Sequence, residues 1–337
     1  MMKKLLSLLL CLVLLTGCAA PAAPEVSDIV PETSEAAPET ADTVPETTEA
    51  VPEPVTFTDD LGRTVTVENP QRVAALLGSF AQVWYLAGGT VCASADDAWD
   101  DFHLPMAPDA VNLGMTKDLS LEKLLGAEPD FIIASANTSQ HRQWQETLEA
   151  TGIPTAYFDV ADFADYLRML EICTRITGRE DQYQEKGLAV QAQIDAVLAR
   201  SAARLDGGEG PTVLSLRASA TYIRAKNSEG NVLGQMLAAL GCRNIADSDD
   251  SLLEDLSVEH ILMADPDFIF FVPSGDDTAG MEDNLNRFFT ENPAWKQLTA
   301  VKEGRVYTLP KELYNLKPND RWGEAYEKIE NILSGAE

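Results

Sequence analysis

The chain has 337 residues and a net charge of −29, from 25 basic and 54 acidic side chains. This length is enough for two lobes with separate cores. The charge disfavours a nucleic-acid-binding protein, because phosphates are neutralised by Lys and Arg, and it disfavours broad contact with anionic lipid. The five cysteines include no CxxC pair, which argues against a zinc ribbon or a thioredoxin-like redox site. We expect Cys92, Cys173 and Cys242 to be packing residues.

The first residues have the pattern of a secretory signal. Two lysines precede an apolar stretch over residues 5–15 that is broken by one serine. This stretch is shorter than the ~20 residues of a membrane span and fits a signal peptide over residues 1–17. Residues 15–18, Leu-Thr-Gly-Cys, resemble the lipobox of bacterial lipoproteins, which implies lipid on Cys18 and an anchor on the extracytoplasmic face of the cell membrane. The alternative is an ordinary signal peptide that contains a cysteine by chance.

Residues 18–55 are predicted to form a disordered tether behind that cysteine. From Ala19 to Val55 there is no Lys, Arg or aromatic residue, and Pro-Glu-Thr recurs at Pro31, Pro38 and Pro45. Such a segment has too little apolar surface to offset the entropy of ordering. Its prolines and carboxylates favour an extended chain with a reach of roughly 100 Å.

An internal repeat follows in the body of the chain. Residues 119–133 (LSLEKLLGAEPDFII) and 256–270 (LSVEHILMADPDFIF) are identical at nine of 15 positions, at an offset of 137. In each copy a serine suited to cap a helix precedes a glutamate in the first turn. A proline then ends the helix, and an apolar run fits a strand buried on both faces of a parallel sheet. Each half is therefore predicted to contain an α/β lobe.

Further elements complete these lobes. Strands are predicted at residues 72–77, 211–216 and 304–309, and helices at 162–176 and 179–205, the second about 40 Å long. The predicted fold class is α/β, with two Rossmann-like lobes joined by a single long backbone helix and a ligand cleft between the lobes. The predicted boundaries are 56–160 for the N-terminal lobe, 161–205 for the connecting helices and 206–337 for the C-terminal lobe.

Residues 57–333 resemble the periplasmic-binding family for siderophores, haem and cobalamin. The resemblance rests on a hairpin at 58–67, the two Ser-x-Glu…Pro-Asp units, the stretch 231–245 and the closing segment 295–307. It implies two α/β lobes joined by one rigid helix. It also implies delivery of a small molecule to the permease dimer of an ABC importer with its ATPase subunits, and we expect the chain to act as a monomer.

The same resemblance implies a docking role for one glutamate of each repeat. Glu122 and Glu259 occupy the same place in the two copies, and in the family the matching glutamates meet arginines on the two permease subunits. The alternative is that both carboxylates only complement a helix dipole.

The sequence also argues against two other classes of protein. An anchored surface enzyme would need catalytic motifs, but the chain has no G-x-S-x-G elbow and no P-loop. Its three histidines, His103, His141 and His260, have no partner at metal-ligand spacing. We therefore expect no enzymatic activity, no resident cofactor and no metal site. A structural or adhesive protein would not need two matched lobes.

Candidate ligand-binding residues follow the predicted strands, because ligands of open α/β sheets bind at the carboxyl ends of strands. They are Ser79, Phe80, Trp84, Trp99, Asn137, Arg217, Tyr222, Arg224, Tyr314, Lys317, Arg321 and Trp322.

The basic residues among them point to an anionic ligand. Arginine forks suit carboxylate or catecholate oxygens, and Trp and Tyr offer flat apolar walls. A ferric siderophore fits this combination best. Haem would also fit, with its propionates on arginine and with Tyr222 or Tyr314 on the iron, and cobalamin, which needs less positive charge, comes third.

Overall fold

The computed structural model describes residues 53–248, 252–253, 256–275 and 277–336. The predicted signal peptide, Cys18 and nearly all of the predicted tether lie outside the described residues. Among the described residues, no helix is both long and apolar enough to cross a membrane.

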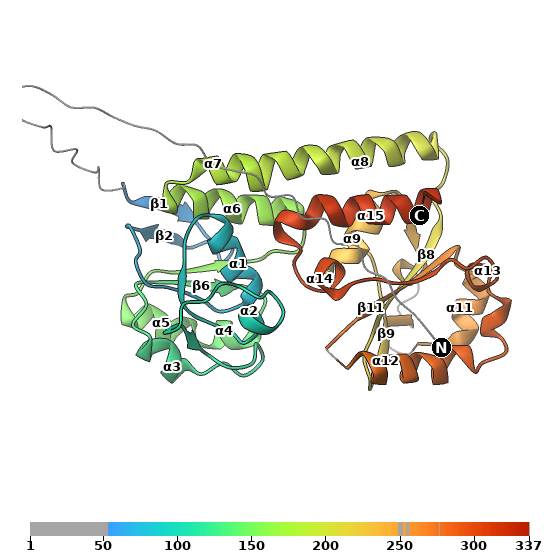
Figure 1. Cartoon of the computed structure of the whole chain (residues 1–337), viewed down its shortest axis with the longest axis horizontal. Helices are drawn as coiled ribbons and strands as arrows, with labels where there is room; N and C mark the ends of the chain where they lie inside the picture. The colour runs from blue at the N-terminus through green and yellow to red at the C-terminus, as the bar shows by residue number, and fades with distance from the viewer. Residues whose placement is uncertain (1–52, 249–251, 254–255, 276, 337) are drawn as a thin grey trace, which may run out of the picture. The chain divides into compact units, whose positions relative to one another are not determined.

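The N-lobe (residues 53–160) contains a hairpin and a parallel sheet (Figure 1). The hairpin pairs β1 (Val55–Thr58) with β2 (Thr64–Val67), as predicted. The sheet has the order β5-β4-β3-β6-β7, and all of its neighbours are parallel. Its strands are β3 (Val73–Ala75), β4 (Val91–Ser94), β5 (Val111–Asn112), β6 (Phe131–Ser135) and β7 (Thr155–Phe158). Its helices are α1 (Gly78–Leu86), α2 (Asp97–Asp100), α3 (Leu121–Gly126), α4 (Ser139–Gln143) and α5 (Gln145–Thr151).

The connection between the lobes is mostly helical, but a left-handed turn at Gly178 divides it and its second part is not one regular α-helix. α6 (Phe163–Thr177) begins at a capping box formed by Asp162 and Asp165 and ends at Gly178, whose φ is 70°. The predicted second helix contains α7 (Glu180–Gln182), the π-helical turn η1 (Tyr183–Leu188) and α8 (Ala189–Leu205).

The C-lobe (residues 206–336) has a second sheet with the order β10-β8-β11-β12, in which β9 pairs antiparallel with β8. Its strands are β8 (Thr212–Ala218), β9 (Ile223–Lys226), β10 (Arg243–Asn244), β11 (Phe268–Pro273) and β12 (Val306–Thr308). Its helical elements are α9 (Val232–Ala239), η2 (Ile245–Asp247), α11 (Val258–Ala264), α12 (Thr278–Leu285), η3 (Asn286–Thr290), η4 (Trp295–Gln297), α13 (Thr299–Lys302), α14 (Lys311–Tyr314), η5 (Asn319–Arg321) and α15 (Trp322–Ser334). α15 lies alongside α8 (Figure 1).

The two copies of the repeat fold in the same way. Ser120 and Ser257 cap α3 and α11 through their side-chain oxygens. The strand that follows each helix, β6 or β11, is almost fully buried. The aspartate after each proline then holds the start of the neighbouring parallel strand: Asp130 accepts hydrogen bonds from the backbone N–H groups of Gln71 and Arg72.

In the C-lobe, Asp267 Oδ2 accepts from the N–H and the hydroxyl of Thr212, each at 2.8 Å. Each copy of the internal repeat therefore supplies one interior strand of its sheet, β6 or β11, and the aspartate that holds the strand beside it. The three cysteines predicted to be packing residues are free thiols, with Cys173 and Cys242 buried and Cys92 half-buried. Burial raises the pKa of the Cys173 and Cys242 thiols to about 12.

Candidate ligand-binding site

Two arginines lie opposite each other at the carboxyl end of β8. Arg217 on β8 pairs in register with Arg224 on β9, and residues opposite each other on antiparallel strands have Cα atoms about 4.5–5.5 Å apart and side chains on one face. Ser215 is paired with Lys226 two residues along, so Lys226 also lies on this face. Like charges directly opposite each other are destabilising, so the fold alone does not account for this arrangement.

A fourth cation, Lys317, comes from the loop after α14. Burial lowers the pKa of the Lys317 ammonium, and the positive charge of Arg217 adds to this, while Asp159 and Asp165 oppose it. Burial likewise lowers the pKa of Arg217. The pKa of Lys226 is lowered by burial and by the two arginines. These four side chains, Arg217, Arg224, Lys226 and Lys317, are called the cationic cluster below.

The members of the cationic cluster lack ion-pair partners within the described part of the chain. None of its four members forms an ion pair with a described carboxylate, whereas Arg321 does so with Glu324 at 2.7 Å. The Arg224 guanidinium lies over the Tyr222 ring, 5.3 Å from the centroid. The Tyr222 hydroxyl donates to Ser274 Oγ at 2.8 Å, which fixes this ring at the end of β11.

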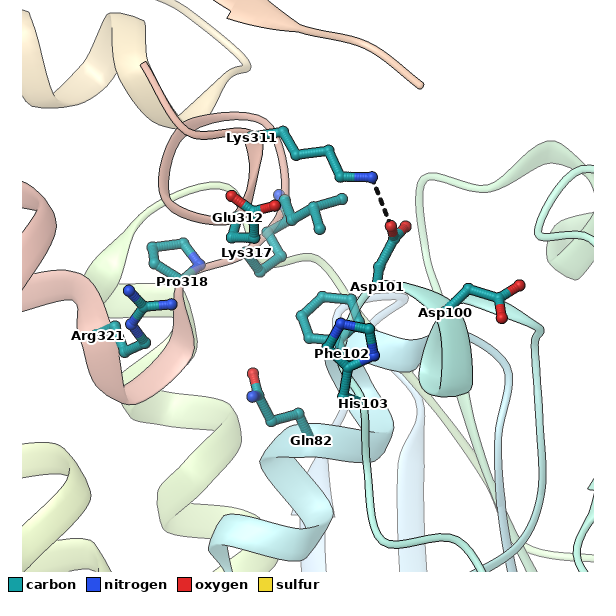
Figure 2. Close-up of a pocket in the computed structure, with 11 residues that line it drawn as sticks. Gln82, Asp100, Asp101, Phe102, His103, Lys311, Glu312, Lys317, Pro318 and Arg321 are labelled. Carbon is teal, nitrogen blue, oxygen red and sulfur yellow. Dashed lines mark hydrogen bonds and ion pairs between the residues drawn. The ribbon is translucent and has the colours of Figure 1, made fainter. Parts of the chain in front are cut away.

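A pocket of about 400 Å³ adjoins the cluster at Lys317 (Figure 2). Its lining comes from both lobes: Gln82, Asp100, Asp101, Phe102, His103, Lys311, Glu312, Leu316, Lys317, Pro318 and Arg321. Its charges are mixed, and Lys311 Nζ forms an ion pair with Asp101 Oδ1 across it at 2.7 Å. The described residues contain no group of three or more His, Cys, Asp or Glu side chains that could hold a metal ion.

The structure brings together some of the predicted ligand-binding residues. Arg217, Tyr222 and Arg224 lie together at the carboxyl end of β8, and Lys317 and Arg321 line the pocket. Trp99 is half-buried in α2. Asn137 is exposed, and its amide donates to Asp159.

Four aromatic residues expected to be ligand walls are core residues instead, so that prediction is wrong for Phe80, Trp84, Tyr314 and Trp322. All four are at most 2 % exposed. Trp84 donates to Thr90 O and packs edge-on against Phe131, and Tyr314 donates to Ala325 O. The spacing of Phe80, Val83 and Trp84 is that of the apolar stripe of a helix, which was the signal for a core position.

Ser79 is also buried, at 6 % exposure, and its carbonyl oxygen accepts a hydrogen bond from Asn319. Sequence reasoning missed Lys226, although the alternation Arg224-Ala225-Lys226 is typical of one strand face. It also missed Asp101, Lys311 and Asn319, whose contacts connect distant parts of the chain.

Two similar lobes with a cationic, strand-end site next to an interlobe pocket define a ligand-binding protein of the two-lobed α/β class. The family model described as "Periplasmic binding protein" matches residues 73–313, and the chain belongs to this family.

Individual relatives agree with this assignment. The chain is 24% identical over 274 residues to a putative ABC transporter substrate-binding lipoprotein of Bacillus subtilis, YhfQ, covering 78% of this chain and 83% of that protein. It is 26% identical to the Fe(3+)-citrate-binding protein YfmC of the same organism, over 76% of this chain and 78% of that one. The crystal structure of Staphylococcus aureus SirA complexed with staphyloferrin B has the same fold, with a TM-score of 0.64 at 19% identity, over 83% of this chain and 98% of that chain. The family and these neighbours are binding proteins.

Proposed function

We propose that this chain is an extracytoplasmic solute-binding lipoprotein that captures an anionic iron complex, a ferric siderophore before haem or cobalamin, and delivers it to an ABC importer. The observation that carries the proposal is the cationic cluster, whose members have no carboxylate partner among the described residues. Arg217, Lys226 and Lys317 are half-buried, whereas Arg224 is exposed, and buried charges are costly unless paired. A ligand with several carboxylate or catecholate oxygens would supply the missing partners through charge-assisted hydrogen bonds.

The relatives support an iron complex as the ligand. One has a name that specifies ferric citrate, a polycarboxylate complex, and another was crystallised with staphyloferrin B. Haem is less well supported, because Tyr314 is buried and the Tyr222 hydroxyl already donates to Ser274. Cobalamin would leave most of the cluster's charge without a partner.

The experiment is a titration of the purified chain, followed by tryptophan fluorescence, with ferric citrate, a ferric tris-catecholate, haem and cyanocobalamin. We expect the ferric carboxylate or catecholate to bind most tightly, and mass spectrometry of the freshly purified protein to find such a complex. Tight binding of haem or cobalamin together with no binding of either ferric complex would overturn the proposed ligand.

Location and delivery are parts of the same proposal. Cys18 would carry the lipid, and residues 18–55 would act as the tether. Glu122 and Glu259 would dock on the permease, one from each lobe. Both glutamates are exposed in the first turns of α3 and α11, and neither has a hydrogen-bond or ion-pair partner among the described side chains. No catalytic role is proposed for any residue.

A further inference from the structure

The segment Lys311–Arg321, called the crossing segment below, follows β12 and leads into α15. It is tied to its own lobe by Asn315 Nδ2, which donates to Pro273 O at 3.1 Å. It also makes two side-chain contacts with the N-lobe, one near each of its ends.

The first contact is the ion pair between Lys311 and Asp101, drawn as a dashed line in Figure 2. The side chains are 17% and 23% exposed, and Nζ lies 2.7 Å from Oδ1. An ion pair that is this well shielded is screened less by salt than a surface pair. It joins the first residue of α14 to the residue that follows α2.

The second contact is made by Asn319, which is 1% exposed. Its Nδ2 donates to Ser79 O at 2.9 Å and to Gln82 Oε1 at 2.7 Å, both on α1 of the N-lobe. Its φ is 50°, a left-handed conformation that Asn adopts more readily than most residues. The buried side-chain amide of Asn319, a C-lobe residue, therefore binds the first turns of an N-lobe helix, and the Asn319 backbone adopts an uncommon conformation to place it there.

Lys317 lies in sequence between these two contacts, and it lines the pocket whose walls come from both lobes. Its ammonium is attracted by Asp159 and Asp165, at the end of β7 and the start of α6, and repelled by Arg217 at the end of β8. The contacts of Lys311 and Asn319 therefore lie on either side, in sequence, of the member of the cationic cluster that lines the interlobe pocket.

We propose that Lys311 and Asn319 are positioning residues that pin the crossing segment onto the N-lobe, fix the separation of the lobes and thereby hold Lys317 opposite Arg217. The part of this inference that concerns lobe separation is independent of the ligand. Its consequence for affinity rests on the proposed function.

The test measures lobe separation in the ligand-free full chain by pulsed electron paramagnetic resonance. Nitroxide labels are attached at Glu146→Cys on α5 and Glu282→Cys on α12, two exposed positions. The chain without these two introduced cysteines, labelled in the same way, gives the background signal from the native cysteines. Lys311→Met combined with Asn319→Gly should shift the distance distribution to longer values and broaden it. Glycine keeps the left-handed backbone accessible while it removes the amide.

The matched control is Arg200→Met combined with Asn69→Gly. Arg200 pairs with Glu327 between α8 and α15, and Asn69 has a φ of 40° and a side-chain oxygen that accepts a hydrogen bond from nearby Gln71. This control should leave the distribution unchanged. The charge exchange Lys311→Asp with Asp101→Lys should restore the narrow distribution that Lys311→Asp alone loses.

An unchanged distribution in the first double variant, or an equal change in the control, would overturn the inference. The proposed function has its own test: it would be overturned if the unmodified chain bound no ferric complex, whatever the lobe separation. If both hold, the double variant should also bind the ferric complex more weakly than the control does.

Discussion

Arg217 and Arg224 are cross-strand partners, two positive side chains in register on β8 and β9 with no carboxylate paired to either among the described residues. Each would make a charge-assisted hydrogen bond to an anionic ligand. A hydrogen bond to a charged group contributes about 1.5–3 kcal/mol, so Arg224→Gln should weaken binding of the ferric complex by roughly 10–100-fold. Isothermal titration calorimetry would measure this.

The same substitution should not destabilise the protein, because it relieves repulsion between like charges across the strands, worth about 0.2–1 kcal/mol. The control is Arg200→Gln, which removes an exposed charge on α8 that pairs with Glu327 outside the cationic cluster, and it should leave affinity unchanged. Unchanged affinity in both Arg224→Gln and Arg217→Gln would remove these residues from the site, and with them most of the case for an anionic ligand.

The pH dependence of stability should contain two opposing contributions. Burial raises the pKa of the Asp97 carboxyl to about 6, aided by Asp96 and Asp101 and opposed by the hydrogen bond from Gly78 N–H. The folded state therefore binds this proton more tightly, and its contribution is lost as pH rises from about 4 to about 6. Burial lowers the pKa of His141 to about 4, so the unfolded state binds that proton more tightly, and the free energy of unfolding rises between about pH 4 and pH 6.5.

Each shift is worth on the order of 3 kcal/mol, so the two nearly cancel in the native chain. Asp97→Asn, which keeps an acceptor for Gly78, should expose the histidine contribution, so the free energy of unfolding should increase with pH over this window. Urea unfolding at pH 4, 5 and 6.5 measures the slope. The prediction is wrong if the slope of Asp97→Asn matches that of the native chain.

The aspartates of the repeat should be stability residues. Asp267→Ala removes both hydrogen bonds that hold Thr212 at the start of β8, and we expect a loss of roughly 1.5–3 kcal/mol in the free energy of unfolding. The control is Asp283→Ala on α12, where the aspartate is exposed and its side chain has no hydrogen-bond partner among the described residues. An equal loss in both variants, measured by thermal and urea unfolding, would contradict this role for Asp267.

The repeat shows what could be predicted from the sequence. Caps, prolines and apolar runs act locally or through simple burial, so the interior strands of both lobes and the connecting helices could be predicted from the residues themselves. The hairpin was predicted from the family resemblance instead. The short edge strands β5 and β10, with two residues each, carry no such pattern. The π-helical turn η1 interrupts a segment whose apolar spacing predicts one continuous α-helix.

The site was predicted less completely, for a physical reason. The side chain of a residue that follows a strand can point into the pocket or back beneath the next helix. A large apolar side chain favours the second orientation, because burial removes its surface from water. Phe80 and Trp322 therefore pack in the core. Lys226 was recoverable from strand alternation. Asn319 was not, because its partners Ser79 and Gln82 lie more than two hundred residues away in the sequence.

The lipid anchor makes a prediction about residues outside those described. Cys18→Ala should release the protein into the medium or block its maturation, because the thiol that would carry the lipid is gone. Membrane fractionation and intact-mass analysis measure the outcome, and Cys92→Ala serves as the control cysteine. A Cys18→Ala protein that stays membrane-bound and is processed as before would show that the resemblance to a lipobox is misleading.

The paired glutamates give the last prediction. Glu122 and Glu259 follow the capping serines of α3 and α11 at the same position, and both side chains are exposed. As helix-dipole partners alone, each is worth about 0.3–1 kcal/mol. As docking residues, each would contact one of the two similar subunits of the permease. Such contacts affect the orientation and association rate of the complex more than the stability of the fold. Glu122→Ala with Glu259→Ala should therefore leave folding and ligand affinity nearly intact.

Transport and ligand-stimulated ATPase activity should fall sharply for this double variant in vesicles that contain the cognate permease. Glu146→Ala, which removes an exposed first-turn glutamate of α5, is the matched control, since it has the same dipole role but lies outside the repeat. If the two glutamates acted only on helix dipoles, the double variant would lose a little stability and transport normally. A loss of transport at unchanged melting temperature and unchanged ligand affinity is the result that docking alone explains, because neither the fold nor the binding site has been altered.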